Sequence, residues 1–200
     1  MKLYYSPGAC SLSPHIVLRE AGLPFSLEKV DLRAKLLADG SDYRAVNPKG
    51  SVPALQLDTG EILTEGPAIV QYIGDLAPQS GLAPAVGTMA RYRLIEALNF
   101  VSTELHKSYS PLFRPNTPDD YKPVARENIV AKYAVVDAVL AERPYLTGDS
   151  FTAADAYLFV VTRWATPLQL DLSQFKNLQA FMARVAERQS VKDALAAEAA

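Results

Sequence analysis

The sequence pattern changes near residue 80, and this change restricts the possible folds more than any other feature. Before it, short β-forming runs alternate with helical runs, in the order strand, helix, strand, irregular segment, strand, strand, helix. After residue 87 nearly all the sequence has a helical pattern. Residues 81–87 between them are rich in Pro, Gly and Ala, which is typical of a linker. We therefore expect an α/β domain over residues 1–80 and an all-helical domain over residues 88–200.

Local signals place the elements of the first half. Gly22-Leu23-Pro24 ends a helix that begins near Ser11, and residues 26–32 alternate as a strand. Asp58-Thr59-Gly60 lies between two short β-type runs and predicts a hairpin turn. Pro67 fits the first turn of a helix, because a missing N–H costs nothing there. Together these elements predict a compact mixed sheet with helices.

The second half is predicted to be entirely helical. Thr152 and Asp155 have the spacing of a capping box, which fixes the start of one helix. The expected helices cover approximately residues 88–112, 119–142, 152–168, 175–187 and 190–197.

Composition excludes several classes of function. The chain has a formal net charge of −2 and no basic cluster, which argues against nucleic acid or an anionic membrane as a partner. No apolar stretch is long enough to span a bilayer. The single cysteine excludes an internal disulfide and fits a reducing cytoplasm. With only two histidines besides, the chain has too few ligands for a zinc site, so we expect no metal.

That single cysteine, Cys10, follows a strand and a Ser-Pro-Gly-Ala loop and stands where a helix begins. The free N–H groups and the dipole of a helix start favour a thiolate, which predicts a pKa below the ordinary value of about 8.5. Ser11 and Ser13 could donate hydrogen bonds to this sulfur or to a bound thiol. The alternative is that Cys10 only fills space in the core. Its place after a glycine-containing loop favours the functional interpretation.

Position 13 is serine, so Cys10 has no resolving thiol one turn away, and disulfide chemistry would need an external thiol. A lone cysteine in this order of strands and helices predicts a thioredoxin-like domain that engages a small thiol. Val52-Pro53 stands directly before a strand, where such folds carry a cis-proline. The exposed backbone of Val52 could then pair with an extended, peptide-like ligand.

Two stripes follow the long helix predicted over residues 88–112. The apolar stripe consists of Leu94, Leu98, Val101 and Leu105. The polar stripe consists of Asn99, Thr103 and His106. Taken alone, the polar stripe favours a solvated or dimer-facing surface over a site.

Five segments resemble the bacterial beta class of glutathione transferases. They are "YYSPGACSLSPHIVLRE", "NPKGSVPAL", "LTEGPAIVQYI", "LNFVSTELHKSYSPLF" and "FTAADAYLFVVTRWA", and they follow in order along essentially the whole chain. The resemblance implies a thioredoxin-like domain that binds glutathione and a helical domain that supplies the acceptor-substrate site. It also implies a homodimer with clefts near the subunit interface.

The resemblance assigns roles to individual residues. It implies that Cys10 and His106 are catalytic, and that glutathione is contacted by Cys10, Lys35, Val52, Glu65, Gly66, Asn99, Thr103, Glu104, Leu105 and His106. Glu65 suits the γ-glutamyl ammonium, and the helix start at Gly66 suits its carboxylate. Family members often carry serine at position 66, so we expect a backbone contact there without the hydroxyl. Some contacts of the polar stripe would come from the neighbouring subunit.

The implied activity is detoxifying conjugation of the glutathione thiol to small apolar electrophiles. The thiolate would be stabilised by the helix terminus and His106, and the electrophile would be held near Tyr109, Phe113 and Trp164. One alternative is glutaredoxin-like thiol–disulfide exchange, or reductive dehalogenation, through a mixed disulfide between Cys10 and glutathione. Another is a non-catalytic ligand-binding protein. Tyr5 is expected to be only a strand residue, and His15 to be structural.

Overall fold

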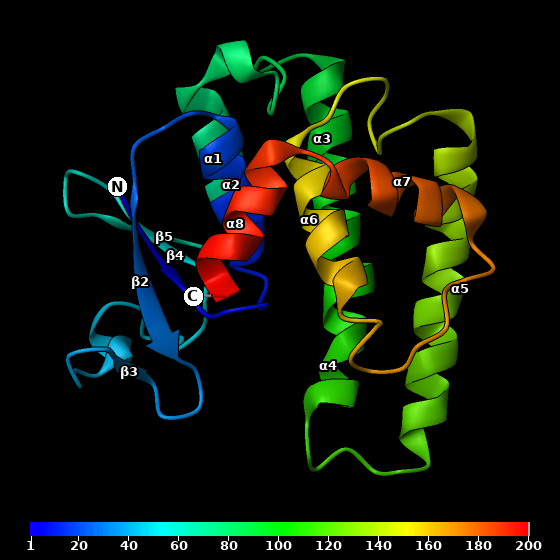
Figure 1. Cartoon of the computed structure of the whole chain (residues 1–200), viewed down its shortest axis with the longest axis horizontal. Coiled ribbons are helices and arrows are strands. Elements are labelled where there is room, and N and C mark those ends of the chain that lie inside the picture. Colours follow the sequence, from blue (N-terminus) through cyan, green and yellow to red (C-terminus); the bar gives the residue numbers. More distant parts are fainter. Residues whose placement is uncertain (200) are drawn as a thin grey trace.

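The computed structural model describes residues 1–199, which form a five-stranded sheet and a bundle of helices (Figure 1). The strands are β1 (Lys2–Tyr5), β2 (Ser26–Asp31), β3 (Leu36–Leu37), β4 (Ala54–Gln56) and β5 (Ile62–Thr64). Their order in the sheet is β3-β2-β1-β4-β5, with β1 parallel to β2 and the other neighbours antiparallel. The expected combination of a thioredoxin-like α/β part with an all-helical part is confirmed.

Strand β1 is the central strand of the sheet, and its apolar residues pair with apolar residues of β2 and β4. Leu3 pairs with Leu27 on β2 and with Leu55 on β4, and neither Leu3 nor Leu55 has exposed surface. The hairpin turn predicted between β4 and β5 is confirmed, with the Leu57 amide donating to the Glu61 carbonyl at 2.9 Å. Gly60 has φ = 90°, a left-handed conformation that glycine adopts without strain.

Except for the end of α6, the helices begin and end close to the predicted residues. They are α1 (Leu12–Glu20), α2 (Gly66–Leu76), α3 (Met89–Phe100), α4 (Lys107–Phe113), α5 (Tyr121–Glu142), α6 (Ala153–Arg163), α7 (Lys176–Ala186) and α8 (Gln189–Ala199). Single 3-10 turns cover Tyr43–Ala45 and Pro78–Ser80. Between α3 and α4 the chain continues as a π-helical segment, η3 (Val101–His106). The one long helix predicted over residues 88–112 therefore contains a local change of helical period.

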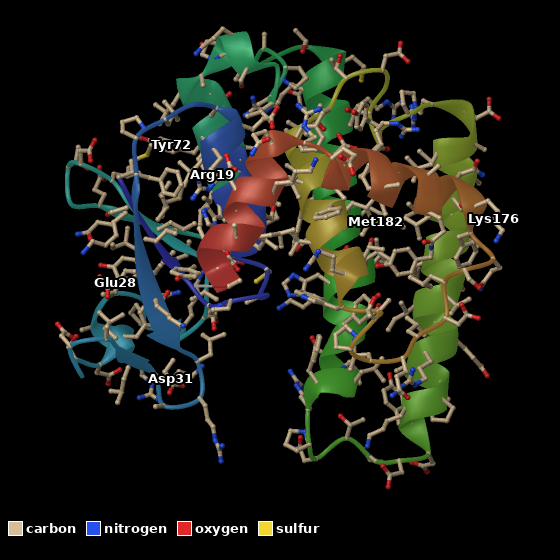
Figure 2. All side chains as sticks on the ribbon, viewed as in Figure 1. Arg19, Glu28, Asp31, Tyr72, Lys176 and Met182 are labelled. Atoms are coloured by element: carbon tan, nitrogen blue, oxygen red, sulfur yellow. The ribbon has the colours of Figure 1, made fainter. Side chains whose placement is uncertain are left out.

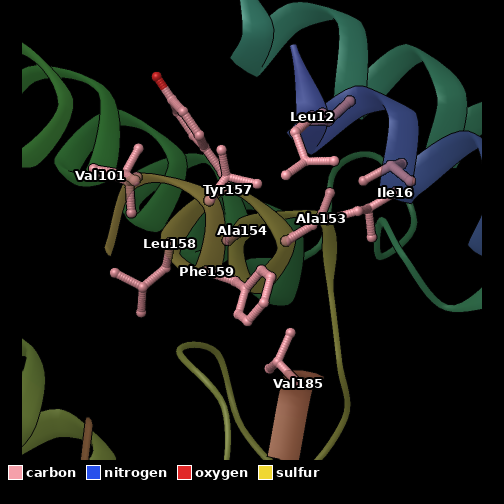
Figure 3. Packing of buried hydrophobic residues seen from close by; sticks show 14 of the residues in the cluster. Leu12, Ile16, Val101, Ala153, Ala154, Tyr157, Leu158, Phe159 and Val185 are labelled. Atoms are coloured by element: carbon pink, nitrogen blue, oxygen red, sulfur yellow. The ribbon is translucent and has the colours of Figure 1, made fainter. Parts of the chain in front are cut away.

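Helix α6 is the centre of the molecule. Every residue from Ala153 to Thr162 is buried, and Figure 3 shows Ala153 beside Leu12 and Ile16 of α1. The predicted capping box is confirmed, since the Thr152 side chain accepts from the Asp155 amide and the Asp155 carboxylate accepts from the Thr152 amide at 2.8 Å. The helix ends at Arg163 rather than near residue 168, because Pro167 would clash with the carbonyl four residues earlier in a continuing helix.

The two parts of the chain share one continuous hydrophobic core. Helix α8 returns from the helical part to pack on α1 (Figure 1). Glu28 on β2 and Lys176 at the start of α7 lie toward opposite ends of the molecule (Figure 2). The helix α5 is long enough to cross a bilayer but carries many charges, and no helix within residues 1–199 combines the required length and hydropathy.

The linker predicted over residues 81–87 is partly embedded in this core. Leu82 and Ala83 are 1% and 7% exposed, and the Leu82 carbonyl accepts a hydrogen bond from the Ala153 amide at 3.0 Å. A Cβ atom added to Gly74 would lie 2.6 Å from the Cβ of Ala83, so glycine is required for this close approach. The connection thus holds the two parts together.

Candidate functional site

A cavity of about 180 Å³ lies where the sheet part meets the helical part. It is bordered by the start of α1, the segment before β4, the start of α2, the η3 segment and α6. Its lining residues are Cys10, Asn47, Lys49, Ser51, Val52, Pro53, Thr64, Glu65, Gly66, Pro67, Ser102, His106, Lys107 and Tyr157. The structure therefore brings together five of the predicted site residues, namely Cys10, Val52, Glu65, Gly66 and His106.

The loop before Cys10 is fixed by the helical part of the chain. The indole N–H of Trp164 donates to the Gly8 carbonyl at 2.9 Å, and the Gly8 amide donates to Glu198 of α8 at 3.0 Å. The Cys10 thiol donates to the Val52 carbonyl across the cavity edge, with Sγ and O 3.2 Å apart. The sulfur is thus held at a defined place, next to the segment expected to bind a peptide.

The expected lowering of the Cys10 pKa is wrong. Cys10 keeps some surface toward the cavity but is densely surrounded, and burial raises the pKa of its thiol to about 11. Backbone N–H groups at the helix start and the charge of Lys107 act in the opposite direction and are outweighed. Cys10 is therefore a neutral thiol near pH 7, able to donate a hydrogen bond.

The expected role of Ser11 as a donor to sulfur is also wrong. Its side chain has no exposed surface, and its hydroxyl donates to the Ser6 carbonyl and accepts from the Ser6 amide, at 3.2 and 3.1 Å. Ser11 therefore closes the loop instead of facing the cavity. Ser13 is 2% exposed and does not line the cavity, and its hydroxyl has no hydrogen-bond partner within residues 1–199.

The segment before β4 is held by two side chains that converge on one carbonyl. The Tyr43 hydroxyl and the Asn47 amide both donate to the Ser51 carbonyl, at 2.9 and 2.7 Å. The Val52–Pro53 bond is cis, as predicted. These contacts fix the backbone of Val52 at the cavity wall.

One end of the cavity carries paired charges. Glu65 adopts φ = 70°, which is uncommon for a residue with a side chain and is characteristic of functional sites. Lys49 Nζ lies 2.6 Å from Glu65 Oε1 and holds the pKa of that carboxyl below its ordinary value. The start of α2 adds the amide of Gly66, since Pro67 has no N–H and the Ala68 and Ile69 amides donate to the Glu65 carbonyl at 3.0 Å. Lys49 was not predicted, although it lies in the loop that leads to Pro53.

His106 reaches the cavity because of the π-helical segment. Its Nδ1 lies 2.5 Å from the Tyr157 hydroxyl oxygen, and its ring packs edge-on against Trp164 with centroids 4.9 Å apart. Burial lowers the pKa of His106 to about 4, so the ring is neutral near pH 7. Asn99 and Thr103, the other members of the polar stripe, are exposed and do not line the cavity. The wider π turn changes the helical phase between Thr103 and His106.

The remaining predicted ligand contacts lie outside the cavity lining. Lys35 Nζ donates to the Gly50 carbonyl at 2.8 Å, and Glu104 forms an ion pair with Lys132 at 2.5 Å. Leu105 has no exposed surface and packs in the core. The roles of Lys35, Asn99, Thr103, Glu104 and Leu105 in binding thus remain predictions.

Of the three aromatic residues expected near the electrophile, Tyr109 is enclosed. It has no exposed surface, and its hydroxyl donates to the Tyr133 hydroxyl at 3.1 Å, so it cannot touch a ligand. Phe113 is 52% exposed and Trp164 is 9% exposed, and these two rings lie edge to face, 5.5 Å apart.

Two side chains near the loop have structural roles, as predicted. Tyr5 is buried in β1. His15 has no exposed surface, and its Nδ1 lies 3.0 Å from Glu198 while its Nε2 accepts from Arg19. Besides Lys49, the sequence analysis missed five polar residues that line the cavity, namely Asn47, Thr64, Ser102, Lys107 and Tyr157. No group of three or more His, Cys, Asp or Glu residues suited to a metal occurs in the part of the chain that the structure describes.

Comparison with known proteins identifies the family. Residues 8–76 match the glutathione S-transferase N-terminal domain, and residues 100–189 match the C-terminal domain. The chain is 52% identical over 198 residues to glutathione S-transferase GstA of Escherichia coli O157:H7, covering 99% of this chain and 98% of the relative.

Two solved structures are similar over nearly their whole length. A sphingomonad glutathione S-transferase complexed with glutathione has 47% identity and a TM-score of 0.97, covering 100% of this chain and 99% of its own. The beta-class enzyme of Sphingomonas chungbukensis has 47% identity and a TM-score of 0.96, with 99% and 98% covered. The chain therefore belongs to the glutathione S-transferase family, and its resemblance to the bacterial beta class is confirmed.

Proposed function

We propose that the protein conjugates the thiol of glutathione to small apolar electrophiles. The observation that carries this proposal is the convergence of Cys10, Val52, Glu65, Gly66 and His106 on one cavity between the two parts of the chain. The similar sphingomonad structure is complexed with glutathione, and the relatives are named glutathione S-transferases. Glutathione is thus the co-substrate.

Glutathione binds as an extended peptide along the cavity. Its γ-glutamyl ammonium pairs with Glu65, and the adjacent carboxylate accepts from the Gly66 amide at the start of α2 and from Lys49. The cysteinyl part pairs with the backbone of Val52, as an added strand would. This arrangement brings the ligand's sulfur between Cys10 and His106.

The enzyme lowers the pKa of the bound thiol and presents its thiolate. The neutral Cys10 thiol, His106 and the charge of Lys107 stabilise the anion as it forms. Lowering the pKa by two units contributes about 2.7 kcal/mol. The thiol proton leaves to solvent, the sulfur forms a bond to the electrophilic carbon, and the leaving group departs with the electron pair of the broken bond. Holding both reactants together supplies much of the remaining acceleration.

Thiol–disulfide exchange through Cys10 is the second candidate. It requires Cys10 to attack as a thiolate, and burial raises the pKa of this thiol to about 11. Conjugation only requires Cys10 to donate a hydrogen bond, so the environment of Cys10 favours conjugation.

The assembly we propose is a homodimer. An apolar hollow of about 320 Å³ between α3 and α5 is lined in part by Phe100, Val135 and Val139. Asn99 and Thr103 are exposed on α3 and η3, away from the cavity of their own chain, where they could serve the cavity of the other copy. A free cysteine and reduced glutathione as co-substrate fit the cytoplasm.

The decisive experiment measures two activities in parallel, for the unmodified protein and for Cys10→Ala. One is conjugation of glutathione to a chloronitroarene, and the other is glutathione–disulfide exchange. If Cys10 acts as a hydrogen-bond donor, Cys10→Ala should slow conjugation without abolishing it, because His106 and Lys107 remain; undiminished conjugation would contradict this role, and complete loss would point to covalent participation of Cys10. If the unmodified protein binds glutathione but shows only exchange, or neither activity, conjugation is rejected as its function.

A further inference from the structure

We propose that Tyr157 is a positioning residue that fixes the tautomer of His106, so that Nε2–H of His106 donates to the sulfur of bound glutathione. The proposal rests on the proposed function and names a residue that acts on the same reaction through His106.

The geometry of the pair is well defined. Tyr157 is 3% exposed and belongs to α6, whose start is fixed by the Thr152–Asp155 capping box. Figure 3 shows its ring leaving α6 on the side opposite to Phe159 and Val185. The Tyr157 hydroxyl meets Nδ1 of His106 at 2.5 Å, and the two rings lie edge to face at 84°. With Nδ1 engaged, Nε2 is the ring nitrogen left for a ligand in the cavity.

The direction of the hydrogen bond follows from the protonation of both groups. Burial lowers the pKa of His106, so near pH 7 the ring carries a single proton. Burial raises the pKa of Tyr157, so the phenol keeps its proton, although a hydrogen bond with Ser102 acts in the opposite direction. The unprotonated nitrogen of a neutral imidazole is a stronger acceptor than a phenol oxygen. Tyr157 therefore donates to Nδ1, and the ring proton lies on Nε2.

The charged and titratable groups around His106 do not reverse this assignment. Lys107, next in the chain, lowers the pKa of His106, whereas Glu65 across the cavity raises it by a smaller amount. Cys10, which lines the same cavity, is a neutral thiol near pH 7. The ring is therefore neutral, and its tautomer depends on the partner of Nδ1.

The tautomer decides what the cavity offers to a thiolate. If the ring proton lies on Nε2, His106 presents a hydrogen-bond donor to the glutathione thiolate. If it lies on Nδ1, the lone pair of Nε2 faces the thiolate and repels it. A fixed donor aimed at developing charge is among the strongest contributions to catalysis, and a histidine in the wrong tautomer loses most of its effect.

The first test uses ¹⁵N NMR of the imidazole rings, which is tractable because the chain has two histidines. We expect His106, assigned by His106→Gln, to show a protonated Nε2 and an unprotonated Nδ1. In Tyr157→Phe the two tautomers should mix, whereas Tyr133→Phe, which removes another buried hydroxyl, should leave the spectrum of His106 unchanged. A proton on Nδ1 in the unmodified protein, or an unchanged tautomer in Tyr157→Phe, would overturn the proposal.

The second test reads the effect on the ligand. Tyr157→Phe should raise the thiol pKa of bound glutathione, which is measured from the absorbance of the thiolate. It should also lower kcat roughly 10- to 100-fold, the effect seen when metal-binding histidines lose their orienting partner. In a His106→Gln background, Tyr157→Phe should lower kcat little further. If it lowered kcat there as much as in the unmodified protein, Tyr157 would not act through His106. If the tautomer behaves as expected but the unmodified protein conjugates nothing, the proposed function fails and the tautomer assignment stands.

Discussion

The Sγ atom of Cys10 lies 3.2 Å from the carbonyl oxygen of Val52, so the thiol bridges the start of α1 and the segment that leads into β4. A thiol that donates to a carbonyl is stabilised in its neutral form, which agrees with the raised pKa of Cys10. The two residues together form the wall against which the cysteinyl part of glutathione would lie. Cys10 thus contributes a hydrogen-bond donor and part of the cavity wall to the site, rather than a reactive thiolate.

The reactivity of Cys10 tests this directly. Against the ordinary thiol pKa of about 8.5, a pKa of about 11 lowers the thiolate fraction of Cys10 near pH 7 more than 100-fold. Alkylation by iodoacetamide should therefore be slow at pH 7 and should accelerate as the pH rises toward 11. Mass spectrometry can follow the alkylation rate of Cys10 directly, because Cys10 is the only cysteine. The Cys10→Ser variant measures alkylation at other residues. Rapid alkylation at pH 7 would show a thiolate and favour exchange chemistry.

Gly66 offers a gain-of-binding test. A Cβ atom added there would have its nearest contact 3.9 Å away, on Pro53, so a side chain fits without strain. Gly66→Ser would add a hydroxyl beside the expected carboxylate of glutathione, worth about 1 kcal/mol or roughly fivefold in affinity. Calorimetric titration with glutathione should detect tighter binding, with Gly66→Ala as the control for the added carbon. Equal affinities of the serine and alanine variants would mean that the carboxylate lies elsewhere.

Trp164 couples the helical part to the Cys10 loop through its N–H bond to Gly8 at 2.9 Å. Trp164→Phe keeps a ring near His106 and Phe113 but removes this bond, which should loosen the loop and raise the KM for glutathione several-fold. Steady-state kinetics at varied glutathione concentration checks the expectation. Tyr145 packs against Phe151 and Phe181 and does not line the cavity, so Tyr145→Phe serves as the control for altering an aromatic residue. An unchanged KM with a reduced kcat would instead place Trp164 at the electrophile.

The sequence predicted the elements whose signals are local. The hairpin turn at Gly60 and the capping box of Thr152 and Asp155 depend on neighbouring residues, and both occur as expected. The cis Val52–Pro53 bond has no decisive local signal and was predicted through the inferred fold. The positions of Cys10 at a helix start and of Val52 before a strand already indicated site residues, whereas Glu65, Gly66 and His106 were identified only through the family resemblance.

The wrong predictions concern properties that depend on tertiary surroundings. Ser11 follows Cys10 in the chain, but the backbone turns its hydroxyl back to Ser6. The pKa of Cys10 moves opposite to the expected direction because desolvation exceeds the effect of the helix start. A uniform period of 3.6 residues could not place His106, since the π segment alters the phase before it. Tyr157 has no signal as a site residue, because it lies within an apolar run and looks like core.

The carboxylate of Asp155 provides a test of how α6 supports the whole molecule. It has no exposed surface and accepts from the Leu146 amide, the Thr152 amide and the Thr152 hydroxyl, each at 2.8 Å. Asp155→Ala would leave buried N–H groups without partners, at about 1–3 kcal/mol each, and would remove the helix cap. We expect the free energy of unfolding to fall by about 2–4 kcal/mol, measured by urea denaturation. The exposed carboxylate of Asp149 provides the control, and Asp149→Ala should change stability by no more than about 0.5 kcal/mol. A similar small change in both variants would contradict a structural role for this cap, because it would mean that water or a rearranged helix start satisfies the freed amides.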